Sequence, residues 1–458
     1  MKINNIEKLS FGLGGGVNAI KTDFFVWYLG AYYLTVLGLN PILTGSALLL
    51  ALFVDAISDP LIGTFSDRIN SKFGRRHILM GLSLVPISIT YFMLFIPDKN
   101  WSESSLFFWL FSFTILTRFS VTLFDIPHRA LAAEIPNTYE EKANIMSMRE
   151  GFQSIIALSH SFIILPYINI DVDENWINVG LVGSVMMFIF GLVSVFGTRS
   201  LIPDLYKWPV ESKKKNTFRE IKEQLRFVYS NKTIILFLLG SITIQLAWGL
   251  ANSLTFLTQT QFWGLDTLQI QEFIKIYFLS TLFSWFLVPK LVQTFEKRTI
   301  LISSLFMIGV FQSVPFISYK LGYAPSFGSD SLVYFLSIFI FITGTFSLIS
   351  LMTRESMVPD MIDQVQKESN LRQDGAISSL TSFCAKCMTG LGQFFSMFVL
   401  WLISFPKGSV EATLQQKEML ALFQGPMIMI LFLIPIFIFA GYKIDREMHK
   451  EILRDLKK

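Results

Sequence analysis

The chain has 458 residues, of which 52% are hydrophobic and only 16% are charged. Soluble domains are nearer a quarter charged, so this composition excludes an ordinary soluble protein and predicts a polytopic membrane protein. The formal net charge of +4 reflects a bias of basic residues toward certain loops, and it does not indicate nucleic-acid binding.

The predicted elements are apolar helices from end to end. Runs of roughly 18 to 25 mainly apolar residues recur along the chain, and each can cross about 30 Å of hydrocarbon as a helix. The sequence therefore predicts an all-α membrane protein with twelve transmembrane helices. The expected spans are residues 20–39, 41–64, 78–97, 105–127, 147–168, 178–199, 233–258, 271–290, 299–319, 331–353, 376–404 and 421–442.

A polar stretch divides the twelve spans into two sets of six. We expect an N-terminal six-helix bundle over residues 1–202, a cytoplasmic linker over 203–232, a C-terminal six-helix bundle over 233–445 and a basic cytoplasmic tail over 446–458. Within the linker, residues 217–229 carry apolar side chains at helical spacing with charges between them. This pattern predicts a short amphipathic helix at the membrane surface.

The two halves repeat each other in sequence position. Arg75 and Arg298 are 223 residues apart, as are Arg149 and Arg372, and both pairs lie in or beside equivalent loops. A parallel repeat of six spans is the signature of the major facilitator fold. Lysine and arginine gather in the loops after spans 2, 4, 6, 8 and 10, so we expect both termini to face the cytoplasm of a plasma (inner) membrane.

The segment VDAISDP, which begins at Val54, places two carboxylates in an otherwise apolar span. Asp55 and Asp59 are four residues apart and share one helical face, so their charges repel unless a proton or a cation compensates them. Such a pair can hold a proton or a hard cation such as Na⁺, with Ser58 and Thr122 as candidate hydroxyl ligands. The alternative is a salt-bridged structural pair near the end of the helix.

Two further charged groups lie inside predicted spans, where an unpartnered charge is costly. Asp125 belongs to a polar stripe on one helix face with Arg118, Thr122 and Arg129. It is a candidate member of the aspartate site, and neutralisation by Arg118 or Arg129 within its own helix is the alternative. Lys386 is a candidate ammonium that competes with or balances the cation, and the alternative is a side chain that reaches the membrane interface.

Other features indicate packing. The glycine-rich FGLGGGVN at Phe11 follows no predicted strand, so we expect close helix approach there and no nucleotide site. We expect the two cysteines to be packing residues without a disulfide or zinc, and His128 and His160 to be structural. Amides and aromatic residues that suit a polyhydroxylated ligand occur in spans 1 and 7, although interfacial belts produce the same aromatics. They are Trp27, Tyr28 and Tyr32 in span 1 and Gln245, Trp248, Asn252 and Gln259 in span 7.

Four motifs taken together resemble one transporter family. They are VDAISDPLIGTFSDRINSKFGRR, DIPHRALAAEI, SMREGF and MVPDMIDQVQKESNLRQDGAISSLTSFCAK. In this order they are similar to the glycoside-pentoside-hexuronide:cation symporters, the melibiose permease family of the major facilitator superfamily. The resemblance covers nearly the whole chain. It implies symport of a sugar or glycoside, coupled to Na⁺, Li⁺ or H⁺, by alternating access and without a cofactor.

The resemblance also implies residue roles. The positions that match the family's cation site are Asp55, Asp59, Thr122, Asp125 and Lys386, and Arg149 matches its span-5 arginine. The stretch GTFSDRINSKFGRR resembles a cytoplasmic loop that holds one conformation shut. The candidates for this latch are Asp67, Arg75, Arg76 and Arg372.

On the substrate side the chain departs from the family. Ala19 stands where the family has a sugar-binding aspartate, with Asn18 beside it and Asp23 one turn later, while Leu52 and Arg129 replace a substrate-site arginine and tryptophan. The substrate candidates are Asn18, Asp23, Trp27, Arg149, Gln245, Trp248 and Asn252. A lipid-like or other non-sugar organic solute is the alternative substrate. We expect a monomer whose partners are a small-molecule substrate and the lipid bilayer. The sequence shows no nucleophile–base pair, so it does not predict an enzyme.

Overall fold

The structure is a computed structural model that describes residues 4–69, 71, 73–134, 139–164, 173–205, 232–369, 374–408 and 410–456. Every regular element in these ranges is a helix, so the all-α class is confirmed. The chain forms two compact units. Unit 1 comprises Met1–Ser212 with Leu400–Glu411, and unit 2 comprises Lys213–Val399 with Ala412–Lys458. The predicted amphipathic helix at 217–229 lies outside the described residues.

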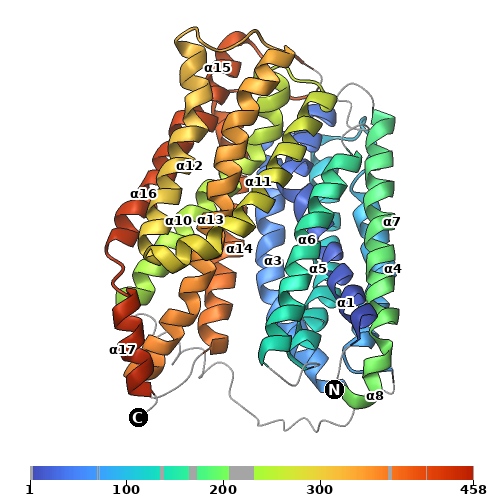
Figure 1. Cartoon of the computed structure of the whole chain (residues 1–458). Coiled ribbons are helices and arrows are strands. Elements are labelled where there is room, and N and C mark those ends of the chain that lie inside the picture. The colour runs from blue at the N-terminus through green and yellow to red at the C-terminus, as the bar shows by residue number, and fades with distance from the viewer. Residues whose placement is uncertain are drawn as a thin grey trace. The chain divides into compact units, whose positions relative to one another are not determined.

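Unit 1, coloured blue to green in Figure 1, is a bundle of long helices. Its elements are α1 (Asn5–Trp27), α2 (Leu29–Ala31), η1 (Tyr32–Val36), α3 (Pro41–Arg68), α4 (His77–Met93), α5 (Glu103–Glu134), α6 (Tyr139–Ile164), α7 (Asp173–Gly197), η3 (Arg199–Leu201) and α8 (Ile202–Leu205). Helix α1 packs against α6 and α7, and α5 packs against α3 and α4. The charged residues predicted on α3 and α5 therefore lie on neighbouring helices.

Unit 2, coloured yellow-green to red, is a second helical bundle. Its elements are α10 (Lys232–Leu257), η4 (Thr258–Phe262), α11 (Thr267–Thr294), α12 (Lys297–Lys320), α13 (Asp330–Ser369), α14 (Asp374–Leu402), α15 (Leu414–Leu422), η5 (Phe423–Met427), α16 (Ile428–Ala440) and α17 (Arg446–Leu456). Helix α13 packs against α11, α12 and α17, and α16 packs against α10 and α12. The long α13 thus extends past the bundle to meet the last helix.

The first helix begins at Asn5, so the predicted first span at residues 20–39 is wrong at its start. A capping box begins the helix, because the Asn4 side chain accepts the Glu7 N–H while the Glu7 carboxylate accepts the Asn4 N–H. The glycine-rich stretch then continues as buried helix. Hydropathy missed this part because its residues are small, and small residues pack helices closely without adding apolar character.

The first long helix of each unit ends in the same way. In unit 1 the π-helical turn η1 is followed by Gly38 with φ of +69°, and in unit 2 the π-helical turn η4 is followed by Gly264 with φ of +65°. A side chain is strained in this left-handed region, so glycine stops both helices. This shared ending supports the internal repeat inferred from the spacing of arginines.

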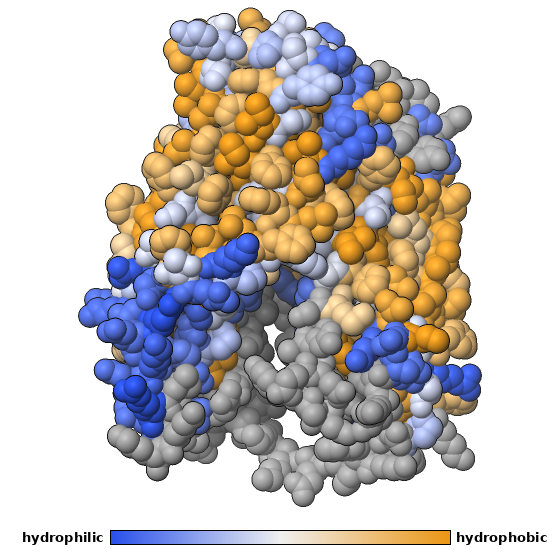
Figure 2. Space-filling model, viewed as in Figure 1, coloured by the Kyte–Doolittle hydropathy of each residue, from blue (hydrophilic) through white to orange (hydrophobic). Residues whose placement is uncertain are grey.

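Eight helices in the described part of the chain are long and apolar enough to cross a membrane. They cover Pro41–Gly63, Glu103–Ala132, Asn175–Leu201, Lys232–Phe262, Thr267–Thr294, Lys297–Lys320, Asp330–Lys367 and Leu414–Ala440, and α4 is a shorter apolar helix. The other long helices, α1, α6 and α14, contain charged candidate residues, which lowers their hydropathy. In each unit, Figure 2 shows apolar residues over the middle of the helices and hydrophilic residues toward their ends. This distribution fits a multi-pass membrane protein.

Candidate functional site

Helices α3 and α5 bring the paired aspartates against polar groups of the neighbouring helix. The Thr122 hydroxyl lies 3.0 Å from Oδ1 of Asp59 and 3.3 Å from Oδ1 of Asp55. Arg118, one turn before Thr122 on α5, places Nη1 2.9 Å from Oδ2 of Asp55. The Ser58 hydroxyl donates to the backbone carbonyl of Asp55 at 3.1 Å. The fold thus brings together four of the predicted cation-site residues, Asp55, Ser58, Asp59 and Thr122, and adds the Arg118 guanidinium as a partner of Asp55.

Asp125 has its own pair of arginines. Its Oδ2 accepts from Nε of Arg129 at 2.8 Å, and its Oδ1 accepts from Nη2 of Arg149 on α6 at 2.5 Å. Neutralisation by Arg129 within the same helix, which was one alternative from the sequence, is therefore present, whereas Arg118 turns to α3 instead. Within the described residues, no group of three or more acidic, histidine or cysteine side chains could hold a metal ion. Asp55 and Asp125 thus each have a guanidinium partner.

The glycine-rich start of α1 allows Arg149 to reach Asp125. A Cβ on Gly14 would lie 2.5 Å from Nε2 of His128 and from the Ser194 hydroxyl, and a Cβ on Gly15 would lie 3.0 Å from the Arg149 carbonyl. The absence of a side chain at Gly14 and Gly15 therefore lets α1 approach these groups closely. The expectation that FGLGGGVN serves close helix approach therefore holds, and the approach positions a residue of the candidate site.

His128 orients the buried Arg149. Nδ1 of His128 accepts from Nε of Arg149 at 3.4 Å, so this ring nitrogen carries no proton. Nε2 then carries the proton and donates to the Phe11 carbonyl at 3.0 Å. Phe11 also stacks on the imidazole ring, with centroids 4.2 Å apart. His128 is a structural residue that fixes one face of the Arg149 guanidinium, as the sequence analysis expected.

His160 is not isolated. Its Nδ1 lies 2.8 Å from Oδ2 of Asp23, and the Ser161 hydroxyl lies 2.9 Å and 2.8 Å from the two oxygens of the same carboxylate. The Tyr28 hydroxyl donates to Ser161 at 3.1 Å. Nε2 of the fully buried His160 has no hydrogen-bond partner in the described part of the chain. This polar cluster joins α1 to α6, and two of its residues, Asp23 and Tyr28, are candidates for substrate contact from the sequence.

The remaining substrate candidates are dispersed. Asn18 and Trp27 of α1 are half-buried, and so are Gln245, Trp248 and Asn252 of α10 in unit 2. The Trp248 ring meets Phe432 of α16 edge to face at 5.4 Å, so one of its sides serves packing. Lys386 of α14 is exposed on unit 2.

The latch candidates are described only in part. Arg76 is buried and donates from Nη1 to the Ser66 hydroxyl of α3 at 2.8 Å, and Arg75 lies beside it in the loop before α4. The side chain of Asp67 and the whole of Arg372 lie outside the described residues.

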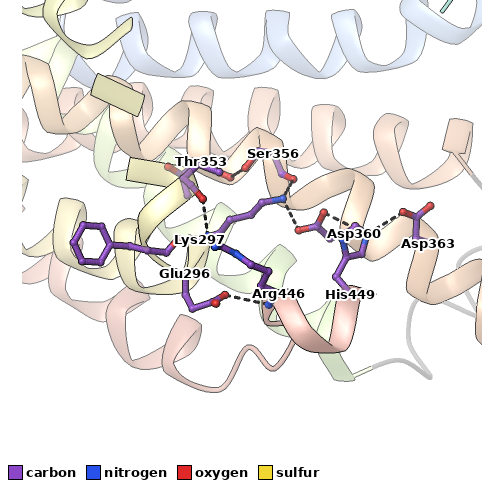
Figure 3. A network of polar contacts seen from close by, with 10 residues as sticks. Glu296, Lys297, Thr353, Ser356, Asp360, Asp363, Arg446 and His449 are labelled. Carbon is purple, nitrogen blue, oxygen red and sulfur yellow. Dashed lines mark hydrogen bonds and ion pairs between the residues drawn. The ribbon is translucent and has the colours of Figure 1, made fainter. Parts of the chain in front are cut away.

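Unit 2 has a polar network at the corresponding loop, which the sequence analysis missed (Figure 3). Lys297 donates to Oδ2 of Asp360 at 2.6 Å, and His449 of α17 lies 3.0 Å from Oδ2 of Asp363. Arg446 donates to backbone carbonyls at the end of α11. Burial raises the pKa of the neighbouring Tyr442 hydroxyl well above its ordinary value, and the charge of Asp360 adds to this effect. The signal for this network was the charged sequence of α17, which had been treated only as a tail.

This geometry, with ion pairs buried between apolar helices, is typical of a membrane transporter. The profile of the family described as "MFS/sugar transport protein" matches residues 10–446. The chain belongs to this family of the major facilitator superfamily and, within it, to the glycoside-pentoside-hexuronide type. Its relatives are transporters and not enzymes.

Individual proteins are similar to this chain over most of its length. The uncharacterised symporter YjmB of Bacillus subtilis (strain 168) is 23% identical over 98% of this chain and 95% of that protein. The isoprimeverose transporter of Lactiplantibacillus pentosus is 20% identical over 84% of this chain and 78% of that protein. The crystal structure of the nucleoside transporter NupG has a TM-score of 0.66 at 11% identity, covering 96% of this chain and all of that one. The last similarity shows the fold alone.

Proposed function

We propose that the protein is a secondary active transporter that couples symport of a sugar or glycoside to a cation by alternating access. In this proposal all twelve predicted spans cross the plasma (inner) membrane as two six-helix bundles, both termini are cytoplasmic, and the protein acts as a monomer. The observation that carries the proposal is the set of buried carboxylates in unit 1. Asp55 is 4% exposed and Asp125 is 8% exposed, and both lie in helices that are otherwise apolar.

Buried charge explains how two solutes can be coupled. Each buried charge costs about several kcal/mol to desolvate, and attraction to its ion-pair partner offsets this cost. A helix bundle that changes conformation must therefore keep these charges compensated. A cation that neutralises Asp59 beside Thr122, or a proton that does so, changes the net charge of the α3–α5 site by one. Asp55, Ser58, Asp125 and Lys386 are the other groups that we propose for this coupling. A charge-compensated carrier changes conformation more readily than an uncompensated one, which is the basis of coupling.

Fewer described contacts support the residues that we propose to bind the substrate. Asp23 with His160 and Ser161, and Asp125 with Arg149, supply fixed acceptors and donors of the kind that hydroxyl groups require. Asn18 and Trp27 lie on the same helix as Asp23, and Gln245, Trp248 and Asn252 are the candidates in unit 2. The isoprimeverose transporter among the relatives also favours a sugar.

Uptake by proteoliposomes tests the proposal. The purified protein is reconstituted and offered a panel of labelled monosaccharides, glycosides and uronides under an inward Na⁺, Li⁺ or H⁺ gradient. We expect accumulation of at least one sugar above its outside concentration, and collapse of this accumulation when the gradient is dissipated. A lysophospholipid in the same panel tests the alternative. Accumulation of the lipid and of no sugar would replace the proposed substrate class.

A further inference from the structure

The α3–α5 site contains a positive charge supplied by the protein itself. The Arg118 guanidinium lies 2.9 Å from Oδ2 of Asp55, with the two side chains only 8% and 5% exposed. The Thr122 hydroxyl lies 3.3 Å from the other oxygen of the same carboxylate. Both oxygens of Asp55 are therefore in contact with groups from α5.

The guanidinium is held in this place from more than one side. Arg118 is one turn before Thr122 on α5, so both side chains point to the same face of α3. The Arg118 guanidinium also lies over the Phe25 ring of α1, 5.2 Å from its centroid, in a cation–π contact. The guanidinium is thus fixed between α1, α3 and α5.

An arginine differs from a free cation in that it cannot leave and cannot lose its proton under physiological conditions. A Na⁺ or Li⁺ ion at Asp55 would need the carboxylate oxygens that Arg118 and Thr122 already contact. It would also lie within a few ångströms of a permanent like charge, in a buried place where such repulsion is weakly screened. The chemistry of the site therefore disfavours an alkali cation beside Arg118.

We infer that Arg118 is a tethered counter-cation that takes the place of an alkali ion at Asp55, so that Na⁺ and Li⁺ do not bind the Asp55–Asp59 pair. The claim that Na⁺ and Li⁺ do not bind this pair of aspartates does not depend on whether the protein transports a solute. Its consequence for coupling rests on the proposed function: of Na⁺, Li⁺ and H⁺, the proton is the ion whose gradient drives accumulation.

The decisive experiment is thermal unfolding of the purified protein in detergent, in sodium, lithium, potassium or choline chloride at equal ionic strength. We compare the wild type with R118M, which keeps most of the side-chain volume, with R118K, which keeps the charge, and with R118M/D55N. The exposed pair of Lys275 and Glu272 in unit 2 supplies a matched control, K275M, which also removes one cation.

For the wild type, for R118K and for K275M, we expect an unfolding temperature that does not change from one salt to another. R118M removes the guanidinium from Asp55, so it should unfold at a lower temperature in choline and recover by several degrees in Na⁺ or Li⁺. This recovery should be lost in R118M/D55N, which no longer has the charge to compensate. A folded R118M that shows no Na⁺ response overturns the inference.

A second measurement does not depend on the folding of R118M. If Na⁺ stabilises the wild type and D55N abolishes that effect, an alkali ion binds at Asp55 beside Arg118 and the inference is wrong. Uptake separates this failure from failure of the proposed function. Sugar accumulation driven by a Na⁺ gradient refutes the tethered cation and leaves symport standing. The absence of accumulation under every gradient refutes symport, whereas the salt response of R118M stands on its own.

Discussion

The two units share a fold repeat but place their charges differently. Unit 1 has two ion pairs deep between its helices, Asp55 with Arg118 and Asp125 with Arg149, together with the buried contact of Asp23 with His160. It also has an exposed ion pair, Lys407 with Glu103. In unit 2, the described ion pairs gather at helix ends and on the exposed surface, such as Lys320 with Glu418 and Lys297 with Asp360. Since a buried charge in a membrane is a candidate functional group, the comparison supports the proposal that the carboxylates of unit 1 take part in coupling. In unit 2, these ion pairs connect the ends of neighbouring helices.

The largest effect is expected at Asp125. D125N leaves Arg149, which is fully buried, without its 2.5 Å carboxylate partner, so we expect a loss of about 3 to 5 kcal/mol in the free energy of unfolding. The control is E150Q, because Glu150 contacts the same guanidinium but its side chain is 56% exposed. E150Q should cost less than about 1 kcal/mol. Equal losses for the two variants in denaturant unfolding would remove the contrast between buried and exposed charge.

The next effect tests the close packing that positions Arg149. The G14A side chain would meet His128 and Ser194 at 2.5 Å, so we expect a loss of about 1 to 3 kcal/mol in unfolding free energy and reduced uptake. Gly81 of α4 offers a matched control, because the nearest atom to its Cβ would be Val195 at 4.0 Å. G81A should be neutral or slightly stabilising in the same measurements. If G14A behaves like G81A, the glycines do not enforce the contact.

In unit 2, K297M tests how the polar network of Figure 3 holds α17 against the bundle. The Lys297 side chain is 29% exposed and bonds Asp360, so its loss should cost about 1 to 2 kcal/mol locally. We expect faster amide hydrogen exchange in residues 446–456 while α10 to α12 keep their protection, because the network fastens an end and not the bundle. Loss of protection throughout unit 2 would show that the network supports the whole bundle.

The smallest effect is expected for the pair of Lys320 and Glu418, whose side chains are 57% and 36% exposed. K320M should change the unfolding free energy by less than about 1 kcal/mol and should leave uptake unchanged. A large loss in this variant, comparable with that of D125N, would mean that surface pairs in unit 2 matter as much as buried pairs in unit 1.

Spacing along one helix predicted much of the site. The four-residue step from Asp55 to Asp59 predicted that both side chains share one face of α3, and in the structure Thr122 of α5 contacts both of them, because helical periodicity is local. The ion-pair partner of each charged residue, in contrast, could not be predicted from spacing along one helix. The sequence offered Arg118 or Arg129 as alternative partners of Asp125 on the same helix, and in the structure Arg118 binds Asp55 on another helix.

Contacts between helices distant in the sequence could not be predicted. Asp23 and His160 are 137 residues apart, and only the packing of α1 on α6 brings them together. The early start of α1 was missed for a related reason, because small residues stabilise a helix through close packing that hydropathy does not measure. The charged last helix carried a visible signal, its alternating basic and acidic residues, but its partners on α13 depend on the tertiary fold.

One measurement tests the central claim most directly. Proteoliposomes containing the wild type or D59N are given a transported sugar, first under an inward ion gradient and then with sugar on both sides and no gradient. We predict that the wild type accumulates the sugar under the gradient, whereas D59N exchanges sugar between the two sides but does not accumulate it. Accumulation by D59N equal to that of the wild type would contradict coupling through the carboxylates of α3.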